Sequence, residues 1–130
     1  MRCDGFSQRL GLLELKSTAA ILPRKFANQC ASLGYDMQLG WYAHGIEQNG
    51  MKCEKITLVA VESKPPYCVV VYDVPRELAE KGYEKASEIA RAYLCCEATG
   101  HFPGVADERQ TLELPEWAEE DKAVNMEGVE

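Results

Sequence analysis

Two apolar runs stand close together in the middle of the chain, Ile-Thr-Leu-Val-Ala-Val at residues 56–61 and Cys-Val-Val-Val-Tyr at residues 68–72. Near-continuous runs of β-branched and aromatic residues favour strands that are covered on both faces of a sheet. The Ser-Lys-Pro-Pro sequence at residues 63–66 is typical of a turn. We therefore expect two strands, at residues 55–62 and 67–72, in a sheet with both faces covered.

The segments on either side of these strands complete an α/β pattern. Residues 10–16, Leu-Gly-Leu-Leu-Glu-Leu-Lys, predict a further strand, with residues 2–4 as a short partner across a turn at residues 5–9. Helices are expected at three places, bounded by Pro, Gly and Asn-Gly: residues 24–33, 36–48 and 76–98. The resulting order is β-β-α-α-β-β-α, which predicts a mixed β-sheet flanked by helices.

Length and charge indicate one globular domain with a separate acidic end. The chain has 130 residues, of which 46% are hydrophobic and 27% charged. No apolar run approaches the roughly 18 residues of a membrane span, and the start has no apolar export segment, so we expect a cytoplasmic protein with no membrane partner. Residues 107–130 hold nine acidic and two basic residues and account for the whole net charge of −7. We assign residues 1–118 to the core and 119–130 to a flexible acidic tail. Because the excess negative charge is confined to residues 107–130, it does not exclude nucleic acid as a binding partner.

Asp4, Glu14 and Lys16 form the first candidate site. Alternate residues of a strand share a face, so Glu14 and Lys16 are expected together, with Leu13 and Leu15 pointing into the core. A hairpin would bring Asp4 beside Glu14, and two adjacent carboxylates repel unless a cation such as Mg²⁺ or Mn²⁺ neutralises them. The lysine could then orient an attacking water or stabilise charge on a phosphate. The same residues also fit a salt bridge on an edge strand.

Gln38 and Tyr42 form the second candidate, because their i, i+4 spacing places them on one face of a helix. A glutamine amide and a phenol can both hydrogen-bond a phosphate or a base edge. The same spacing also fits a half-buried amphipathic helix in which Tyr42 packs beside Trp41. The six cysteines contain no Cys-x-x-Cys motif, which favours free or buried thiols over a metal site or disulfides.

Together these segments resemble the PDDEXK nuclease superfamily, specifically its RecB-like branch and the catalytic domain of phage and prophage exonuclease VIII (RecE-type). The residues that carry the resemblance follow one another over residues 4–118: Asp4, Glu-Leu-Lys-Ser-Thr at 14–18, Gly-Tyr-Asp-Met-Gln-Leu-Gly-Trp-Tyr at 34–42, Glu62 with Pro-Pro-Tyr at 65–67, Gly-His-Phe-Pro-Gly at 100–104, and Gln-Thr-Leu-Glu-Leu-Pro-Glu-Trp-Ala at 110–118.

The resemblance implies a restriction-endonuclease-like core and a Mg²⁺-dependent (or Mn²⁺-dependent) 5′→3′ exonuclease acting on double-stranded DNA ends. Asp4 and Glu14 would ligate the metal with the Leu15 main-chain carbonyl, and Lys16 would position the attacking water. Gln38 and Tyr42 match the branch's Gln-x-x-x-Tyr motif, which implies contact with DNA near the scissile phosphate.

The resemblance also implies partners and a setting. Such enzymes serve recombination with a single-strand annealing protein, in the cytoplasm of a bacterial or phage-infected cell, and related exonucleases are often homo-oligomers. Some relatives hold an iron–sulfur cluster on four cysteines, but the required cysteine spacing is absent here, so none is expected.

The chain departs from the branch at its start. The branch places a histidine on helices upstream of the first aspartate, whereas this chain begins at that aspartate, which predicts a core without the N-terminal helices. The alternative function is therefore a catalytically incomplete fragment that acts as a DNA-binding or oligomerisation module. A third hypothesis takes the acidic tail as a DNA-mimicking or partner-docking segment.

Overall fold

The computed structural model describes residues 2–106 and 108–115. Within these residues the chain forms a mixed four-stranded sheet and three helices, and the predicted α/β order is confirmed. The elements are β1 (Gly5–Ser7), β2 (Gly11–Thr18), α1 (Pro23–Ser32), α2 (Tyr35–Gln48), β3 (Ile56–Glu62), β4 (Val69–Asp73) and α3 (Arg76–Thr99). None of the described helices combines the length and apolar character needed to cross a bilayer.

The N-terminal hairpin differs from the prediction. The short strand lies at Gly5–Ser7 rather than at residues 2–4, and it pairs antiparallel with the start of β2, with Gly5 opposite Leu13. The physical reason is a tighter turn than expected: the Leu10 N–H donates to Ser7 Oγ at 3.0 Å, so the strands continue up to residues 7 and 11. Extending the register by one residue sets Asp4, which directly precedes β1, across from Glu14.

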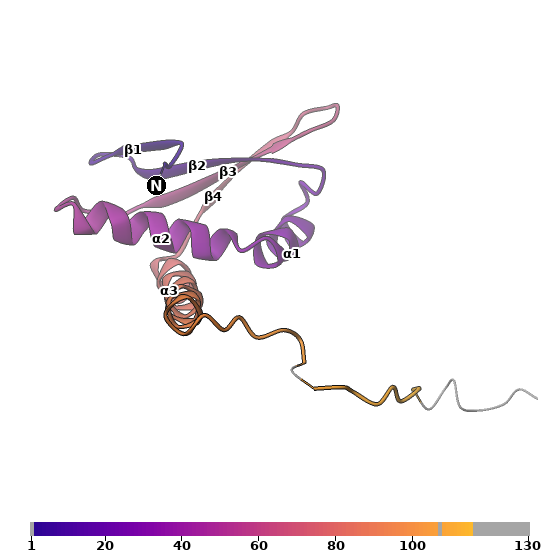
Figure 1. Cartoon of the computed structure of the whole chain (residues 1–130). Coiled ribbons are helices and arrows are strands. Elements are labelled where there is room, and N and C mark those ends of the chain that lie inside the picture. Colours follow the sequence, from indigo (N-terminus) through magenta and orange to yellow (C-terminus); the bar gives the residue numbers. More distant parts are fainter. Residues whose placement is uncertain (1, 107, 116–130) are drawn as a thin grey trace, which may run out of the picture.

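The sheet has the order β1-β2-β3-β4, with β2 and β3 parallel at its centre and antiparallel pairs at both edges. A parallel pair needs a long crossover, and α1 and α2 supply it. Figure 1 shows α2 running along one face of the sheet, α1 at one end of that face, and α3 on the side of α2 away from the sheet. The core lies between the sheet and α2, where Leu12 and Leu39 are fully buried.

In the described part of the chain, the helices cover only one face of the sheet, and the prediction of two covered faces is wrong. Leu15 and Val71 point away from the helices and are 50% and 63% exposed, and Leu13 is also exposed. The expectation that Leu13 and Leu15 enter the core is therefore wrong as well. Glu14 and Lys16 occupy the helix-facing side instead, because α2 provides polar side chains to meet them there.

Two glycines allow α2 and α3 to pack closely. A Cβ on Gly40 would collide with the Ala79 carbonyl oxygen, and a Cβ on Gly82 would collide with the Asp36 carbonyl oxygen. The backbones of the two helices therefore approach at distances that only glycine permits at these positions. Any larger side chain there would push the helices apart.

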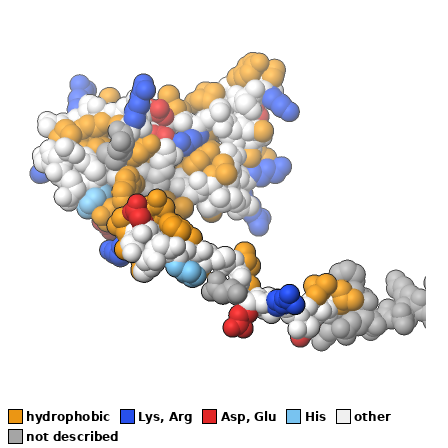
Figure 2. All heavy atoms as spheres, in the orientation of Figure 1, with side chains coloured by type: hydrophobic (Ala, Val, Ile, Leu, Met, Phe, Trp, Pro, Cys, Tyr) orange, Lys and Arg blue, Asp and Glu red, His pale blue; other side chains and the backbone are white. Residues whose placement is uncertain are grey.

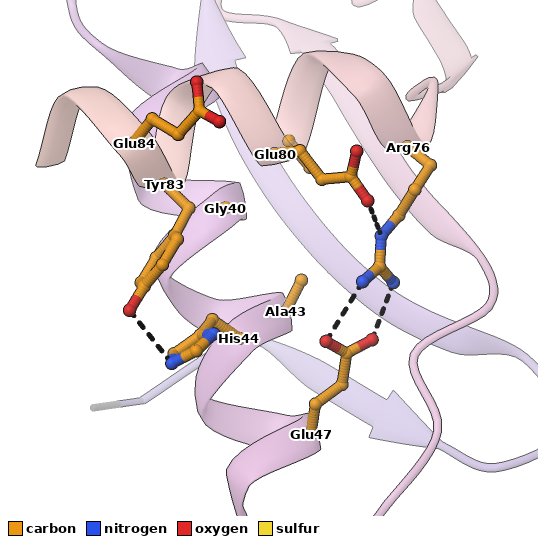
Figure 3. A pocket seen from close by; sticks show the side chains of 9 residues that line it. Gly40, Ala43, His44, Glu47, Arg76, Glu80, Tyr83 and Glu84 are labelled. Atoms are coloured by element: carbon orange, nitrogen blue, oxygen red, sulfur yellow. Dashed lines mark hydrogen bonds and ion pairs between the residues drawn. The ribbon is translucent and has the colours of Figure 1, made fainter. Parts of the chain in front are cut away.

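Side-chain contacts fasten the two helices beside this glycine contact (Figure 3). Arg76 donates to both carboxylate oxygens of Glu47, at 2.7 and 3.0 Å, and also to Glu80 and the Cys53 carbonyl. These contacts raise the Arg76 pKa further above its usual value, so the guanidinium stays charged. One helical turn away, the His44 ring stacks on Tyr83 and its Nε2 lies 3.0 Å from the Tyr83 hydroxyl.

The C-terminal part of α3 extends beyond the packed body. Ile89, Tyr93 and Leu94 are each more than half exposed, and Figure 2 shows hydrophobic side chains at the surface over this helix. Gly100 ends α3 in the left-handed conformation, and the described residues after it form neither helix nor strand. The predicted acidic tail at 119–130 and the boundary at residue 118 lie outside the described residues.

Candidate active site

Four of the predicted site residues meet between β2 and α2. The centre is Glu14, whose side chain is 5% exposed. Its Oε1 accepts hydrogen bonds from Lys16 Nζ at 2.7 Å and from Gln38 Nε2 at 2.9 Å. Gln38 Nε2 also donates to the Tyr42 hydroxyl at 3.0 Å. The strand candidate and the helix candidate therefore form one continuous polar cluster.

Asp4 joins this cluster through the backbone of β2. Its Oδ2 accepts a hydrogen bond from the Leu15 N–H at 2.9 Å. The N–H and C=O of a strand residue point to the same edge, so the Leu15 carbonyl also faces the Asp4 side. The pairing with β1 stops at Gly5 and Leu13, so that ladder does not occupy the Leu15 carbonyl. Asp4, the Leu15 carbonyl and Glu14 thus come from adjacent positions at one end of the hairpin.

The unpartnered oxygen of Glu14 fits a divalent cation. Glu14 Oε2 is buried and has no hydrogen-bond partner within the described residues. A buried acceptor without a partner costs about 1–3 kcal/mol, which an ion at that position would recover. Carboxylate and carbonyl oxygens are the ligands that Mg²⁺ and Mn²⁺ prefer.

The ligand set contains few acidic groups. Among residues 2–106 and 108–115, no group of three or more His, Cys, Asp and Glu side chains is placed to hold a metal ion. An ion at this position would therefore rely on Asp4, Glu14 and the Leu15 carbonyl, with water completing its coordination.

Sequence reasoning missed the residues on the far side of Lys16. Lys16 Nζ lies 4.8 Å from the centroid of the Tyr35 ring. Behind Tyr35, Gln29 Nε2 is 3.5 Å from the Tyr35 hydroxyl, and Gln29 Oε1 accepts from Thr18 Oγ1 at 2.6 Å. Helical spacing could have found Tyr35, because residues 35, 38 and 42 share one face of α2. Nothing in the local sequence indicates Gln29, which comes from a different helix.

The two structural alternatives raised from the sequence each hold in part. Lys16 and Glu14 do form a salt bridge, but it lies under α2 and not on an open edge. Tyr42 does pack against the main core cluster, while the aromatic partner of Trp41 is Tyr83, with ring centroids 5.8 Å apart. The polar cluster and the core thus share the same helix face.

Other segments that carry the resemblance lie away from the cluster. Glu62 stands at the end of β3, where its Oε2 accepts from the Cys68 N–H at 3.3 Å. Residues 101–104 and 110–115 are exposed and follow α3, and residues 116–118 lie outside the described part.

The environment of Cys30 on α1 favours the neutral thiol. Burial raises the Cys30 pKa, and the nearby Asp36 raises it further. Metal ligation by cysteine requires the thiolate, so this side chain is poorly suited to bind an ion at neutral pH.

Comparison with family models identifies a family for this chain. Residues 2–115 match the model described as PDDEXK-like domain of unknown function (DUF3799). The comparison with curated proteins returns no match. The matched range contains all seven strands and helices and the whole Asp4–Glu14–Lys16–Gln38–Tyr42 cluster. Because the match spans most of its length, the chain belongs to the family of PDDEXK-like domains of unknown function.

Proposed function

We propose that this chain is the core of a metal-dependent DNA exonuclease that hydrolyses phosphodiester bonds at double-stranded DNA ends. The observation that carries the proposal is the hydrogen bonding of the two Glu14 carboxylate oxygens. One carboxylate oxygen is held by Lys16 and Gln38, and the other is buried and has no partner among the residues that the structure describes. A purely structural salt bridge gains nothing from leaving a buried acceptor unpaired, whereas a cation site requires it.

Each residue of the cluster would have a separate role in the reaction. Asp4, Glu14 and the Leu15 carbonyl would hold Mg²⁺ or Mn²⁺, which supplies Lewis-acid stabilisation of charge on the scissile phosphate. Lys16 places an ammonium group next to Glu14, where it can hydrogen-bond an attacking water or a phosphate oxygen. Gln38 donates to the same Glu14 oxygen as Lys16 and also donates to the Tyr42 hydroxyl, which helps to orient it.

The wider setting follows from the resemblance to RecE-type enzymes. We propose linear duplex DNA ends as the substrate, with Gln38 and Tyr42 facing the backbone near the cleaved bond. A single-strand annealing protein is the proposed partner in recombination, and a homo-oligomer is the proposed assembly. The setting we propose is the cytoplasm of a bacterial or phage-infected cell.

The test compares linear and closed circular duplex DNA with Mg²⁺, with Mn²⁺ and with a chelator. We expect degradation of linear DNA only, dependent on the metal. Glu14→Ala and Lys16→Ala should each lower the rate by about 100-fold or more. Glu62→Gln is the matched control, because within residues 2–106 and 108–115 the Glu62 carboxylate hydrogen-bonds only the local Cys68 N–H. Unchanged rates in both site variants would overturn the assignment.

A non-catalytic role is the second candidate, and the small number of acidic ligands in the described part favours it. In that case the chain is a DNA-binding or oligomerisation module that keeps the fold without turnover. It should bind duplex ends with an affinity that falls as salt rises, because phosphate contacts release counterions. Binding without cleavage under every divalent metal supports this role, and cleavage excludes it.

A further inference from the structure

The Lys16 ammonium contacts two groups of different character. It donates to Glu14 Oε1 at 2.7 Å, and it lies 4.8 Å from the centroid of the Tyr35 ring. An aromatic face within about 6 Å attracts a cation, most strongly where water is excluded. The Lys16 side chain is only 17% exposed, so the ring contact forms in a mostly dry environment.

The Tyr35 ring is itself held from α1. Its hydroxyl lies 3.5 Å from Gln29 Nε2, and Gln29 in turn accepts a strong hydrogen bond from Thr18. The Phe26 ring packs beside it, with centroids 6.5 Å apart. Tyr35 is also the first residue of α2, directly after Gly34 in the left-handed conformation, so the turn between α1 and α2 determines where the ring stands.

A lysine side chain needs this support more than most groups do. Four rotatable bonds separate the ammonium from the backbone, so a single contact with Glu14 leaves many conformations available. Glu14 Oε1 also receives the Gln38 hydrogen bond, so its lone pairs are shared. The ring supplies a second contact close to Lys16 Nζ and limits where the ammonium can go.

We infer that Tyr35 is a positioning residue, which acts through its aromatic face to hold the Lys16 ammonium at Glu14. This inference deepens the proposed function and rests on it where catalysis is concerned. The required group is the ring and not the hydroxyl, because the hydroxyl contact with Gln29 is long and the ring contact involves the cation directly.

The kinetic test uses three variants of the full chain on linear duplex DNA. Tyr35→Phe keeps the ring and should retain kcat within about threefold of wild type. Tyr35→Leu removes the ring and should lower kcat about tenfold while KM for DNA stays within about twofold. Tyr83→Leu is the packing control: it makes the same ring-to-leucine change at a residue that packs on His44 and Trp41, so it should lower thermal stability and leave kcat near wild type.

A second readout does not depend on catalysis. The rate at which an N-hydroxysuccinimide ester acylates Lys16 is measured by mass spectrometry, with exposed Lys85 as the internal reference. Lys16 should react several-fold faster in Tyr35→Leu than in wild type or Tyr35→Phe. Equal Lys16 acylation in wild type and Tyr35→Leu would overturn the inference. If wild type does not cleave DNA at all, the proposed function fails, and the acylation result still decides the role of Tyr35.

Discussion

Replacing Glu14 by Gln tests the proposed cation site without any DNA present. The substitution keeps the size of the side chain and removes the charge that a cation would neutralise. A ligand at ten times its dissociation constant stabilises the folded state by about 1.4 kcal/mol. In a domain of this size that free energy corresponds to a rise in Tm of about 4–6 °C. The value is consistent with satisfying one buried acceptor, Glu14 Oε2, which costs about 1–3 kcal/mol when unpaired.

The assay is thermal unfolding of wild type and Glu14→Gln with a chelator, with Mg²⁺ and with Mn²⁺. The Tm of wild type should rise with either metal, whereas the Tm of Glu14→Gln should hardly change. Glu62→Gln is the control and should respond like wild type, because Glu62 lies on β3 and binds only the Cys68 N–H in the described chain. An unchanged Tm for wild type, or equal gains in wild type and Glu14→Gln, would refute the cation site.

Five further substitutions, at four positions, test the packing that supports the site. Gly82→Ala should lower the free energy of urea unfolding by about 1–3 kcal/mol, because its Cβ meets the Asp36 carbonyl. Arg76→Ala should lower the free energy of urea unfolding by about 1–2 kcal/mol. Arg76→Lys should recover only part of that loss, since lysine cannot bind a carboxylate through two parallel donors. Leu15→Lys should leave circular dichroism and Tm close to wild type, whereas Leu12→Lys, at a fully buried position, should abolish folding; a comparable loss in both would contradict the one-sided covering of the sheet.

The sequence predicted the elements well where local rules act alone. Pro23 and Gly34 bound α1 in the structure as expected, and α2, β3 and α3 begin or end within about one residue of the predicted positions. Only the resemblance joined Asp4 and the two side-chain pairs into one site, whereas the pairs themselves, Glu14 with Lys16 and Gln38 with Tyr42, followed from spacing. In each case the information lies within one helix face or one strand face.

What failed depends on contacts between elements. The face that β2 turns toward the helices cannot be read from alternation, because Leu-x-Leu and Glu-x-Lys alternate equally well and only tertiary packing chooses between them. Burying Leu13 and Leu15 was the simpler expectation, and the structure instead turns Glu14 and Lys16 inward. Gln29 was missed for the same reason, since its contact with Tyr35 joins two helices through a turn.

The inward orientation of Glu14 argues for function more strongly than the residue types do. Burying a carboxylate and an ammonium costs desolvation that their attraction rarely exceeds by much, so apolar side chains at these two positions would serve the fold at least as well. The strand already carries Leu13 and Leu15 one position away, yet these apolar groups face outward while the charged pair faces the core side. Around the pair, Gln38, Tyr42 and Tyr35 are arranged to hold charge in place and leave one carboxylate oxygen unsatisfied. A fold that accepts this cost at its central strand, with each charged group contacted by two partners, supports the proposal that the site positions charge for a ligand at the expense of some stability.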